Sequence, residues 1–247
     1  MRNRFITFPL DREKQNERTR GFARIAGFPM LQGAIDYTHF AMRAQHVNLV
    51  IYMNKKGFHS LNVQLVYDHT QCIMGVNTRY PESSHNVFTM RQSNMPAIFE
   101  PARQVKGWLL GDQGYPLMRW LTIPVRNTRT RAEWAYNESH AAMCNVIDRT
   151  IGVLKQCFRC LDRCVGTLQY SAERVSRFIV VCCTLHDLVI MREQSLPPII
   201  QHDPEPEEEE AEAEGEEEAE DEREEMEGEV EEDKEHWPNL PGLCVLT

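Results

Sequence analysis

Three aspartates stand in sequence settings that could support metal-dependent chemistry: Asp36 in the segment 33–39, Asp112 in 108–115 and Asp148 in 145–155. Each follows or interrupts an apolar run, so we expect them to lie on separate secondary-structure elements. Hard divalent cations such as Mg²⁺ prefer oxygen ligands. Two such ions about 3.5–4 Å apart can stabilise both the attacking and the leaving oxygen when a phosphodiester is cut. The three carboxylates therefore predict a two-metal phosphodiester-cutting site.

The periodicity of the apolar residues predicts the elements that would position these aspartates. The first predicted strand, at 31–36, continues at 40–44 after a turn or bulge. A polar insertion is expected at about 126–136. The predicted strands cover 31–36, 58–67, 72–80 and 107–110. One helix is predicted to begin at 86–91, and two further helices cover 139–161 and 172–192.

This order predicts an α/β fold with a ribonuclease H-like mixed sheet flanked by helices. Three antiparallel strands come first, then a helix, a fourth strand and two late helices. In such a fold one carboxylate lies on the first strand, one just past the fourth strand and one on a late helix. Asp36, Asp112 and Asp148 occupy those three places.

The charge is divided unevenly along the 247 residues, which carry 37 acidic and 27 basic side chains and a net charge of −10. Residues 203–235 hold 22 of the acids and only two bases, so this segment is −20 and the rest of the chain is +10. We expect a partial N-terminal lead-in at 1–27, a nuclease-like domain at 28–195 and a disordered acidic tail at 196–247. A basic body suits DNA, although charge alone is equally compatible with ordinary solubility.

The eight cysteines favour a reducing compartment with free thiols, because the sequence shows no signal peptide and no membrane-spanning apolar run. Cys157 and Cys160 have the spacing of zinc ligands, and Cys164 follows them. No second pair of ligands stands at a usual distance, so we interpret the cysteines as packing residues and keep zinc as the alternative.

Five segments resemble the Harbinger transposase-derived nucleases, of the PIF/Harbinger DDE transposase class. They are Gly-Ala-Ile-Asp at 33–36 with Thr-His at 38–39, the run 54–62, the loop 80–86, Gly-Asp-Gln-Gly-Tyr-Pro-Leu at 111–117 and the helix segment 147–155. The similarity extends over about 20–192, and 158–161 and 166–171 also resemble the vertebrate domesticated branch. The chain starts at the catalytic domain, so we expect the family's helical N-terminal region to be absent.

Four positions depart from the family pattern. Asp148 replaces the usual Glu, which shortens the side chain by one methylene, roughly 1.5 Å. Magnesium demands near-ideal octahedral ligation, so this change could disable the site unless a water bridges the gap. Asn86 replaces Asp, Cys144 replaces Arg, and Tyr37 replaces Gly and is expected to add bulk beside Asp36.

The resemblance implies a DNA endonuclease that uses Mg²⁺ or Mn²⁺ held by the three aspartates. Contacts around the metals or with DNA are expected from His39, His85, Asn86 and Lys155, although structural histidines and a solvated lysine are the ordinary alternative. The alternative function is a catalytically impaired domesticated transposase that acts as a DNA- or protein-binding factor.

The resemblance also implies partners and a location. We expect DNA and a Myb-like DNA-binding protein as partners, no association with a membrane, and a nuclear location with a further cytoplasmic pool. The acidic tail, at −20, could compete with DNA for the basic body.

Overall fold

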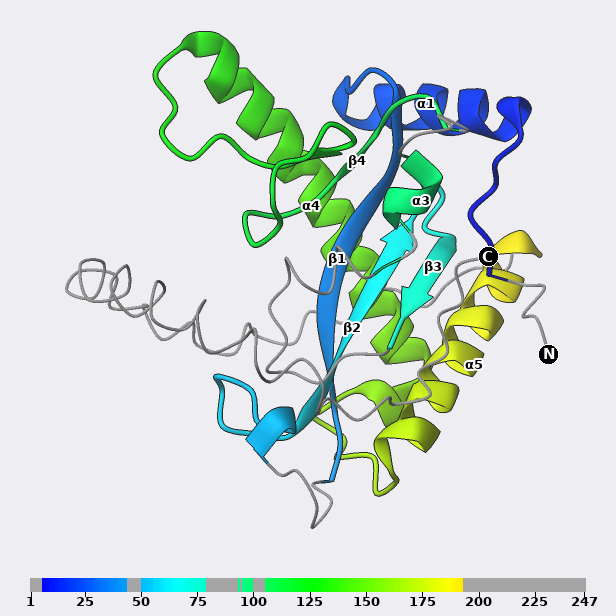
Figure 1. The fold of residues 1–247 in the computed structure, drawn as a ribbon. Helices are drawn as coiled ribbons and strands as arrows, with labels where there is room; N and C mark the ends of the chain where they lie inside the picture. The colour runs from blue at the N-terminus through cyan, green and yellow to red at the C-terminus, as the bar shows by residue number, and fades with distance from the viewer. Residues whose placement is uncertain (1–5, 44–49, 79–92, 94, 100–104, 193–247) are drawn as a thin grey trace. The chain divides into compact units, whose positions relative to one another are not determined.

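The computed structural model describes residues 6–43, 50–78, 93, 95–99 and 105–192 (Figure 1). The expected acidic tail at 196–247 and the helix start expected at 86–91 lie outside these residues. None of the helices in the described ranges is long and apolar enough to cross a membrane.

A five-stranded mixed sheet forms the centre of the fold, in the order β3-β2-β1-β4-β5. Strand β1 pairs antiparallel with β2 and parallel with β4, while β2–β3 is antiparallel and β4–β5 is parallel. This arrangement confirms the predicted α/β fold with a mixed sheet flanked by helices. The strands are β1 (Leu31–Ala41), β2 (Ser60–Tyr67), β3 (Ile73–Asn77), β4 (Trp108–Leu110) and β5 (Leu121–Thr122).

Strand β1 is longer than the sequence predicted, because it continues through Ala41 without the expected turn or bulge. Asp36 therefore lies in the middle of a strand rather than at its end. Gly33 lets the neighbouring strands approach. A Cβ atom at Gly33 would lie 2.9 Å from the Met74 side chain and 3.0 Å from both Leu109 and the Tyr67 carbonyl.

Helix α4 (Arg131–Cys157) crosses behind β1 and β2, and helix α5 (Ala172–Met191) runs beside β3 (Figure 1). The expected start of α4 at 139 is wrong by two turns. Thr130 and Glu133 form a reciprocal capping box, and this polar pair begins the helix inside the stretch that was predicted as an insertion. The predicted extent of α5 is confirmed to within a residue.

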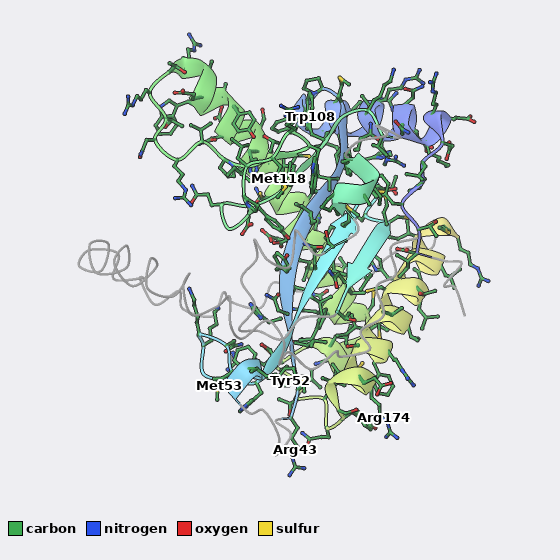
Figure 2. All side chains as sticks on the ribbon, in the orientation of Figure 1. Arg43, Tyr52, Met53, Trp108, Met118 and Arg174 are labelled. Atoms are coloured by element: carbon green, nitrogen blue, oxygen red, sulfur yellow. The ribbon has the colours of Figure 1, made fainter. Side chains whose placement is uncertain are left out.

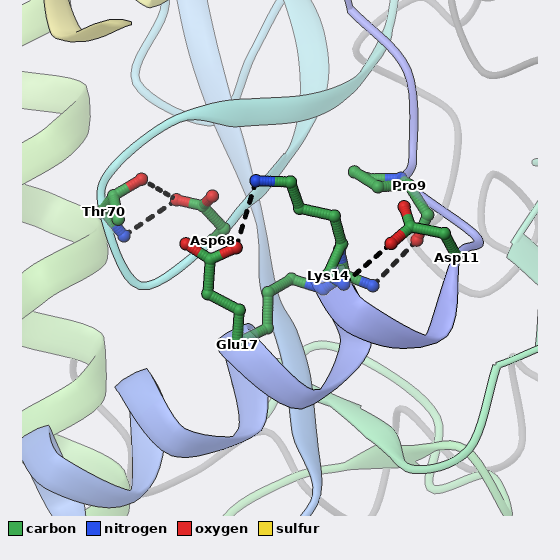
Figure 3. Close-up of polar contacts among 7 residues, drawn as sticks. Pro9, Asp11, Lys14, Glu17, Asp68 and Thr70 are labelled. Atoms are coloured by element: carbon green, nitrogen blue, oxygen red, sulfur yellow. Dashed lines mark hydrogen bonds and ion pairs between the residues drawn. The ribbon is translucent and has the colours of Figure 1, made fainter.

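Helix α1 (Arg12–Ala26) occupies most of the segment 1–27, which the sequence analysis gave as a partial N-terminal lead-in. Asp11 caps its start by accepting from Lys14 N at 2.8 Å, and Lys14 pairs with Glu17 at 3.0 Å (Figure 3). Its buried face includes Arg18, whose guanidinium donates to Gln32 and to the Pro9 carbonyl. The buried face of the helix, which packs on β1, sets Gln15 and Arg18 beside Phe22, so apolar periodicity did not reveal it.

The face of the sheet opposite α4 carries an apolar cluster. The cluster includes residues of the short helix α3 (Met95–Phe99), which the sequence did not predict. Two aromatic rings of the cluster stack, with the centroids of Phe99 and Trp120 5.4 Å apart. The buried members of the cluster are Phe8, Ile35, Val66, Met74, Met95, Phe99, Val105, Leu109, Tyr115, Trp120 and Leu121.

A buried carboxyl joins α5 to the sheet. Asp187 is 3% exposed and accepts from Ile73 N at 2.8 Å. Burial raises the pKa of Asp187 to about 7; the Ile73 hydrogen bond opposes this shift, and the charge of Asp68 adds to it.

Ionisation of the Asp187 carboxyl should therefore lower the free energy of unfolding as the pH rises. Between about pH 4 and pH 7 the native chain keeps the Asp187 proton that the unfolded chain has released, so stability present below pH 4 is lost as the pH passes 7. Asp187→Asn keeps an oxygen for Ile73 N and removes the ionisation. Urea unfolding should show the variant gaining on the order of 4 kcal/mol relative to the parent between pH 4 and pH 8. A difference that does not change with pH would contradict this assignment.

Candidate active site

The parallel register of β1 and β4 brings two of the aspartates to the same level of the sheet. Ala34 pairs with Leu110, so Asp36 and Asp112 each lie two residues beyond a paired position. Because side chains alternate along a strand, Asp36 points to the α4 face together with Ala34 and Phe40. The end of β4 therefore delivers Asp112 beside Asp36.

Helix α4 places Asp148 over the same face. Lys155, seven residues further along the helix, has its Nζ 5.4 Å above the ring of Phe40, which lies four residues beyond Asp36 on β1. Seven helical residues rise about 10 Å and four strand residues about 13 Å, so the helix runs in the direction of β1 with Asp148 near Asp36. The three predicted carboxylates thus come from three separate elements and face one region.

The charges of the other two carboxylates act on Asp36. Burial raises the pKa of the half-buried Asp36 to about 7, and the charges of Asp112 and Asp148 add to the rise. The hydrogen bond from Tyr37 N, at 2.7 Å, and the charge of Lys155 act in the opposite direction. The pKa of Asp112 and of Asp148 is also raised by partial desolvation, although both side chains are largely exposed.

Cys144 lies among the carboxylates, at the position where the family resemblance implies an arginine. Burial raises the pKa of its thiol to about 11, and the charges of Asp148, Asp36 and Asp112 contribute in that order. A cation at this position would lower the pKa values of the acids. With a neutral thiol there instead, the negative charge of the cluster is offset mainly by Lys155 at a distance.

His140 connects the Asp112 loop to α4. Its Nε2 lies 2.9 Å from the Gly111 carbonyl, and its Nδ1 lies 3.4 Å from Cys144 Sγ. A carbonyl only accepts, so Nε2 carries the proton and Nδ1 accepts from the thiol. Burial lowers the pKa of His140, which agrees with a neutral ring. His140 was not singled out as a candidate site residue from the sequence, although the four-residue spacing of His140, Cys144 and Asp148 places all three on one helical face.

Tyr37 does not crowd Asp36 as the sequence suggested, because it points to the opposite face of β1. Its ring stacks on Tyr115 with centroids 5.0 Å apart, and its hydroxyl accepts from Gln64 Nε2 at 2.8 Å. Tyr115 N in turn donates to the Asp112 carbonyl at 3.3 Å. The stacked pair therefore fixes the turn that carries Asp112, a positioning role that the sequence did not indicate.

The remaining predicted residues are placed as follows. His39 lies three residues beyond Asp36 on the other face of β1, with its Nδ1 3.4 Å from Ser60 Oγ. His85 and Asn86 lie outside the described residues. Among the residues that the structure describes, no three His, Cys, Asp or Glu side chains, the clustered cysteines included, are grouped closely enough to hold one metal ion.

Known proteins resemble this chain over the same region. A family model described as DDE superfamily endonuclease matches residues 35–187. The chain is 38% identical over 186 residues to "Putative nuclease HARBI1" of Homo sapiens, covering 75% of this chain and 53% of that protein. It is 33% identical over 194 residues to the Xenopus laevis protein of the same name, covering 78% and 56%.

A plant protein matches as well: the chain is 28% identical over 212 residues to "Protein ALP1-like" of Arabidopsis thaliana, covering 77% and 51%. The chain spans about half the length of the curated relatives it matches. No solved structure matches the chain.

The convergence of the three carboxylates predicts how Asp36 titrates in metal-free buffer. Carboxyl ¹³C NMR should find a pKa of about 7 for Asp36, and the value should fall in Asp112→Asn and, to a smaller extent, in Asp148→Asn, because each variant removes a neighbouring negative charge. Asp162→Asn, which changes an acid remote from the cluster, is the control and should leave the value unchanged. Identical titration of Asp36 in all four proteins would show that the aspartates are too far apart to share a site.

Proposed function

Because the chain belongs to the DDE superfamily endonucleases, and more narrowly to the Harbinger transposase-derived nucleases, we propose that it is a metal-dependent nuclease domain that hydrolyses DNA phosphodiester bonds. The proposed site consists of Asp36, Asp112 and Asp148. The observation that carries the proposal is the placement of these three carboxylates on one face of the sheet by β1, the end of β4 and α4; the raised pKa of Asp36, to which the other two carboxylates contribute, agrees with it. Three acids on separate elements with unbalanced charge are expensive to hold together unless a cation binds them.

The donor set suits a hard divalent cation. DDE-type endonuclease domains generally use divalent metals, and the donors here are carboxylate oxygens, which Mg²⁺ and Mn²⁺ prefer. In a two-metal site Asp36 would contribute from the centre of the sheet, Asp112 from the loop and Asp148 from the helix, and no single ion would need all three side chains, which in the described residues are not grouped closely enough for that. When bound, a divalent cation supplies Lewis-acid activation of the phosphate and of the attacking water.

The chain's own residues provide the supports for this chemistry. His140 and the Tyr37–Tyr115 stack keep the Asp112 turn in register with α4 and β1. Lys155 lies on the same face as the acids and its positive charge lowers the pKa of Asp36, so it suits a phosphate of the bound strand. Water reaches the site through the exposed sides of Asp112 and Asp148.

A second candidate function rests on the length of one side chain. Asp148 reaches one methylene less far than the Glu that the family resemblance implies, and its carboxylate is exposed on α4. A chain that retains the fold but binds metal weakly would act as a DNA- or protein-binding factor. In either case we propose DNA and a Myb-like DNA-binding protein as partners, and a nuclear location with a cytoplasmic pool.

Cleavage of supercoiled plasmid distinguishes the two functions. The parent should nick DNA in Mg²⁺ or Mn²⁺, and Asp36→Ala should lose about 100-fold or more of the rate, the loss typical when one electrostatic contributor to a transition state is removed. Asp148→Glu should cut faster than the parent because it restores the longer reach. Glu13→Ala, which removes an exposed acid of α1 outside the site, is the matched control and should cut like the parent.

Two other outcomes would change the assignment. An inert parent with an active Asp148→Glu variant would mean that the fold is intact and the shorter side chain has disabled it. An inert parent and an inert Asp148→Glu variant, both folded, would leave the binding factor as the function.

A further inference from the structure

Three segments meet at the end of the sheet where β1 finishes, and we call them together the basic end. They are residues 41–43 at the end of β1, residues 53–60 from the 3₁₀ helix η1 (Val50–Tyr52) to the start of β2, and residues 155–168 from the last turn of α4 into the connection with α5. Their single acid is Asp162, and their six bases are Arg43, Lys55, Lys56, Lys155, Arg159 and Arg163. The basic end is therefore +5, half of the +10 carried by the chain outside 203–235.

Backbone hydrogen bonds hold the three segments together. Met42 N donates to the His59 carbonyl at 3.0 Å. Arg43 N donates to the Leu168 carbonyl at 2.8 Å, and Leu168 N donates back to the Ala41 carbonyl at 3.1 Å. Arg43 and Met53 lie at this end of the sheet in Figure 2, remote from Trp108 near the start of β1. The bases of the basic end thus share one rigid region although they are up to 120 residues apart in sequence.

The two lysines of the basic end project from a built turn. The buried Asn54 accepts from Phe58 N through its side chain at 3.1 Å and from Gly57 N through its carbonyl at 3.0 Å. Its side-chain amide donates to Ser60 Oγ at 3.1 Å. Gly57 has a φ of 76°, which a residue without Cβ adopts at no steric cost. Lys55 and Lys56 are exposed at the tip of this turn.

Aromatic rings fix two of the other cations. The Arg163 guanidinium lies 4.0 Å from the centroid of the Phe58 ring, and Lys155 lies over Phe40. A guanidinium stacked on a ring keeps its N–H donors directed outward along its edge, the geometry that suits a phosphate. The stack also joins Arg163 to the lysine turn, since Phe58 belongs to that turn.

The spacing between the basic end and the acid cluster suits a duplex. Phe40, beneath Lys155, is four residues beyond Asp36 on β1, and Arg43 is seven residues beyond it. At about 3.3 Å per strand residue these positions lie roughly 13 and 23 Å from Asp36. Duplex DNA rises about 3.4 Å per base pair, so a helix aligned with β1 would present phosphates to the basic end about four to seven base pairs from the acid cluster.

We propose that the basic end is a sequence-independent binding surface for the phosphate backbone of duplex DNA flanking the proposed cleavage point. This inference rests on the proposed function in that DNA is the substrate, but it does not require the chain to cut. Lys55 and Lys56 contact phosphates as mobile point charges, and Arg163 contacts them through its fixed guanidinium. Because these contacts reach the backbone and no base edges, they fix the position of the duplex on the protein and do not select its sequence.

The test is equilibrium binding of the full chain to a fluorescein-labelled duplex of about 30 base pairs and arbitrary sequence, without divalent metal, at several salt concentrations. Each phosphate contact contributes about 0.9 to the slope of log affinity against log salt. Lys55→Ala/Lys56→Ala/Arg163→Ala should therefore lower that slope by about 2–3 and weaken binding at least about tenfold at low salt.

The matched control is Arg12→Ala/Arg20→Ala/Arg24→Ala, which removes the same charge from exposed positions of α1, at the start of β1. It should weaken binding by less than about threefold. Equal losses of DNA affinity in the two triple variants would overturn the proposal, because only net charge would then matter. Parent-like binding by the basic-end variant would also overturn it. Lys55→Ala/Lys56→Ala alone changes only the exposed tip of the turn, so it should fold like the parent and still lower the slope by about 2.

The outcomes separate this inference from the proposed function. A parent that binds DNA through the basic end and does not cut with metal leaves the surface established and removes the nuclease activity. A parent that cuts DNA while the basic-end variant binds like the parent removes the surface and leaves the activity. Tighter binding of an RNA duplex than of the DNA duplex through the same side chains would also overturn the assignment to DNA.

Discussion

The parallel pairing of β4 with β1 is the constraint on which the rest of the structure depends. Leu110 opposite Ala34 puts Asp112 level with Asp36, and a shift of one residue would turn one of the two carboxylates to the other face. The Tyr37–Tyr115 stack and the His140–Gly111 hydrogen bond both act to keep the end of β4 in that register. Helix α4 then needs only to lie along β1 for Asp148 to complete the cluster.

The molecule separates its charges along the direction of β1. Acids gather at the middle of the strand, where Cys144 provides no positive charge to balance them, and bases gather at its end. The acid cluster is unfavourable for folding by itself, as the raised pKa of Asp36 shows, and such a cost is typical of sites that bind a cation. The basic end lies in the direction in which a polyanion bound at the cluster would extend. The two regions are therefore complementary parts of one proposed DNA-binding face.

Sequence periodicity predicted the elements that bury apolar residues and missed those that begin or pack through polar ones. Asp36 and Asp112 were located because apolar runs surround them, and α5 because it is apolar over most of its length. Helix α1 was missed because its buried face contains Gln15 and Arg18. The first two turns of α4 were missed because a polar capping box begins them. The stacking of Tyr37 on Tyr115 could not be predicted, since it joins residues 78 positions apart that only the register of β4 brings together.

Mn²⁺ binding, followed by EPR of the free ion, tests most directly whether the three aspartates together form a divalent-cation site. Metal-free parent protein should bind Mn²⁺, and Asp36→Asn, Asp112→Asn and Asp148→Asn should each weaken that binding at least about tenfold, the size typical of losing one support of a metal site. Asp162→Asn should bind like the parent. If the parent binds no Mn²⁺, or if the three variants bind it as tightly as the parent does, the acids do not form a common metal site.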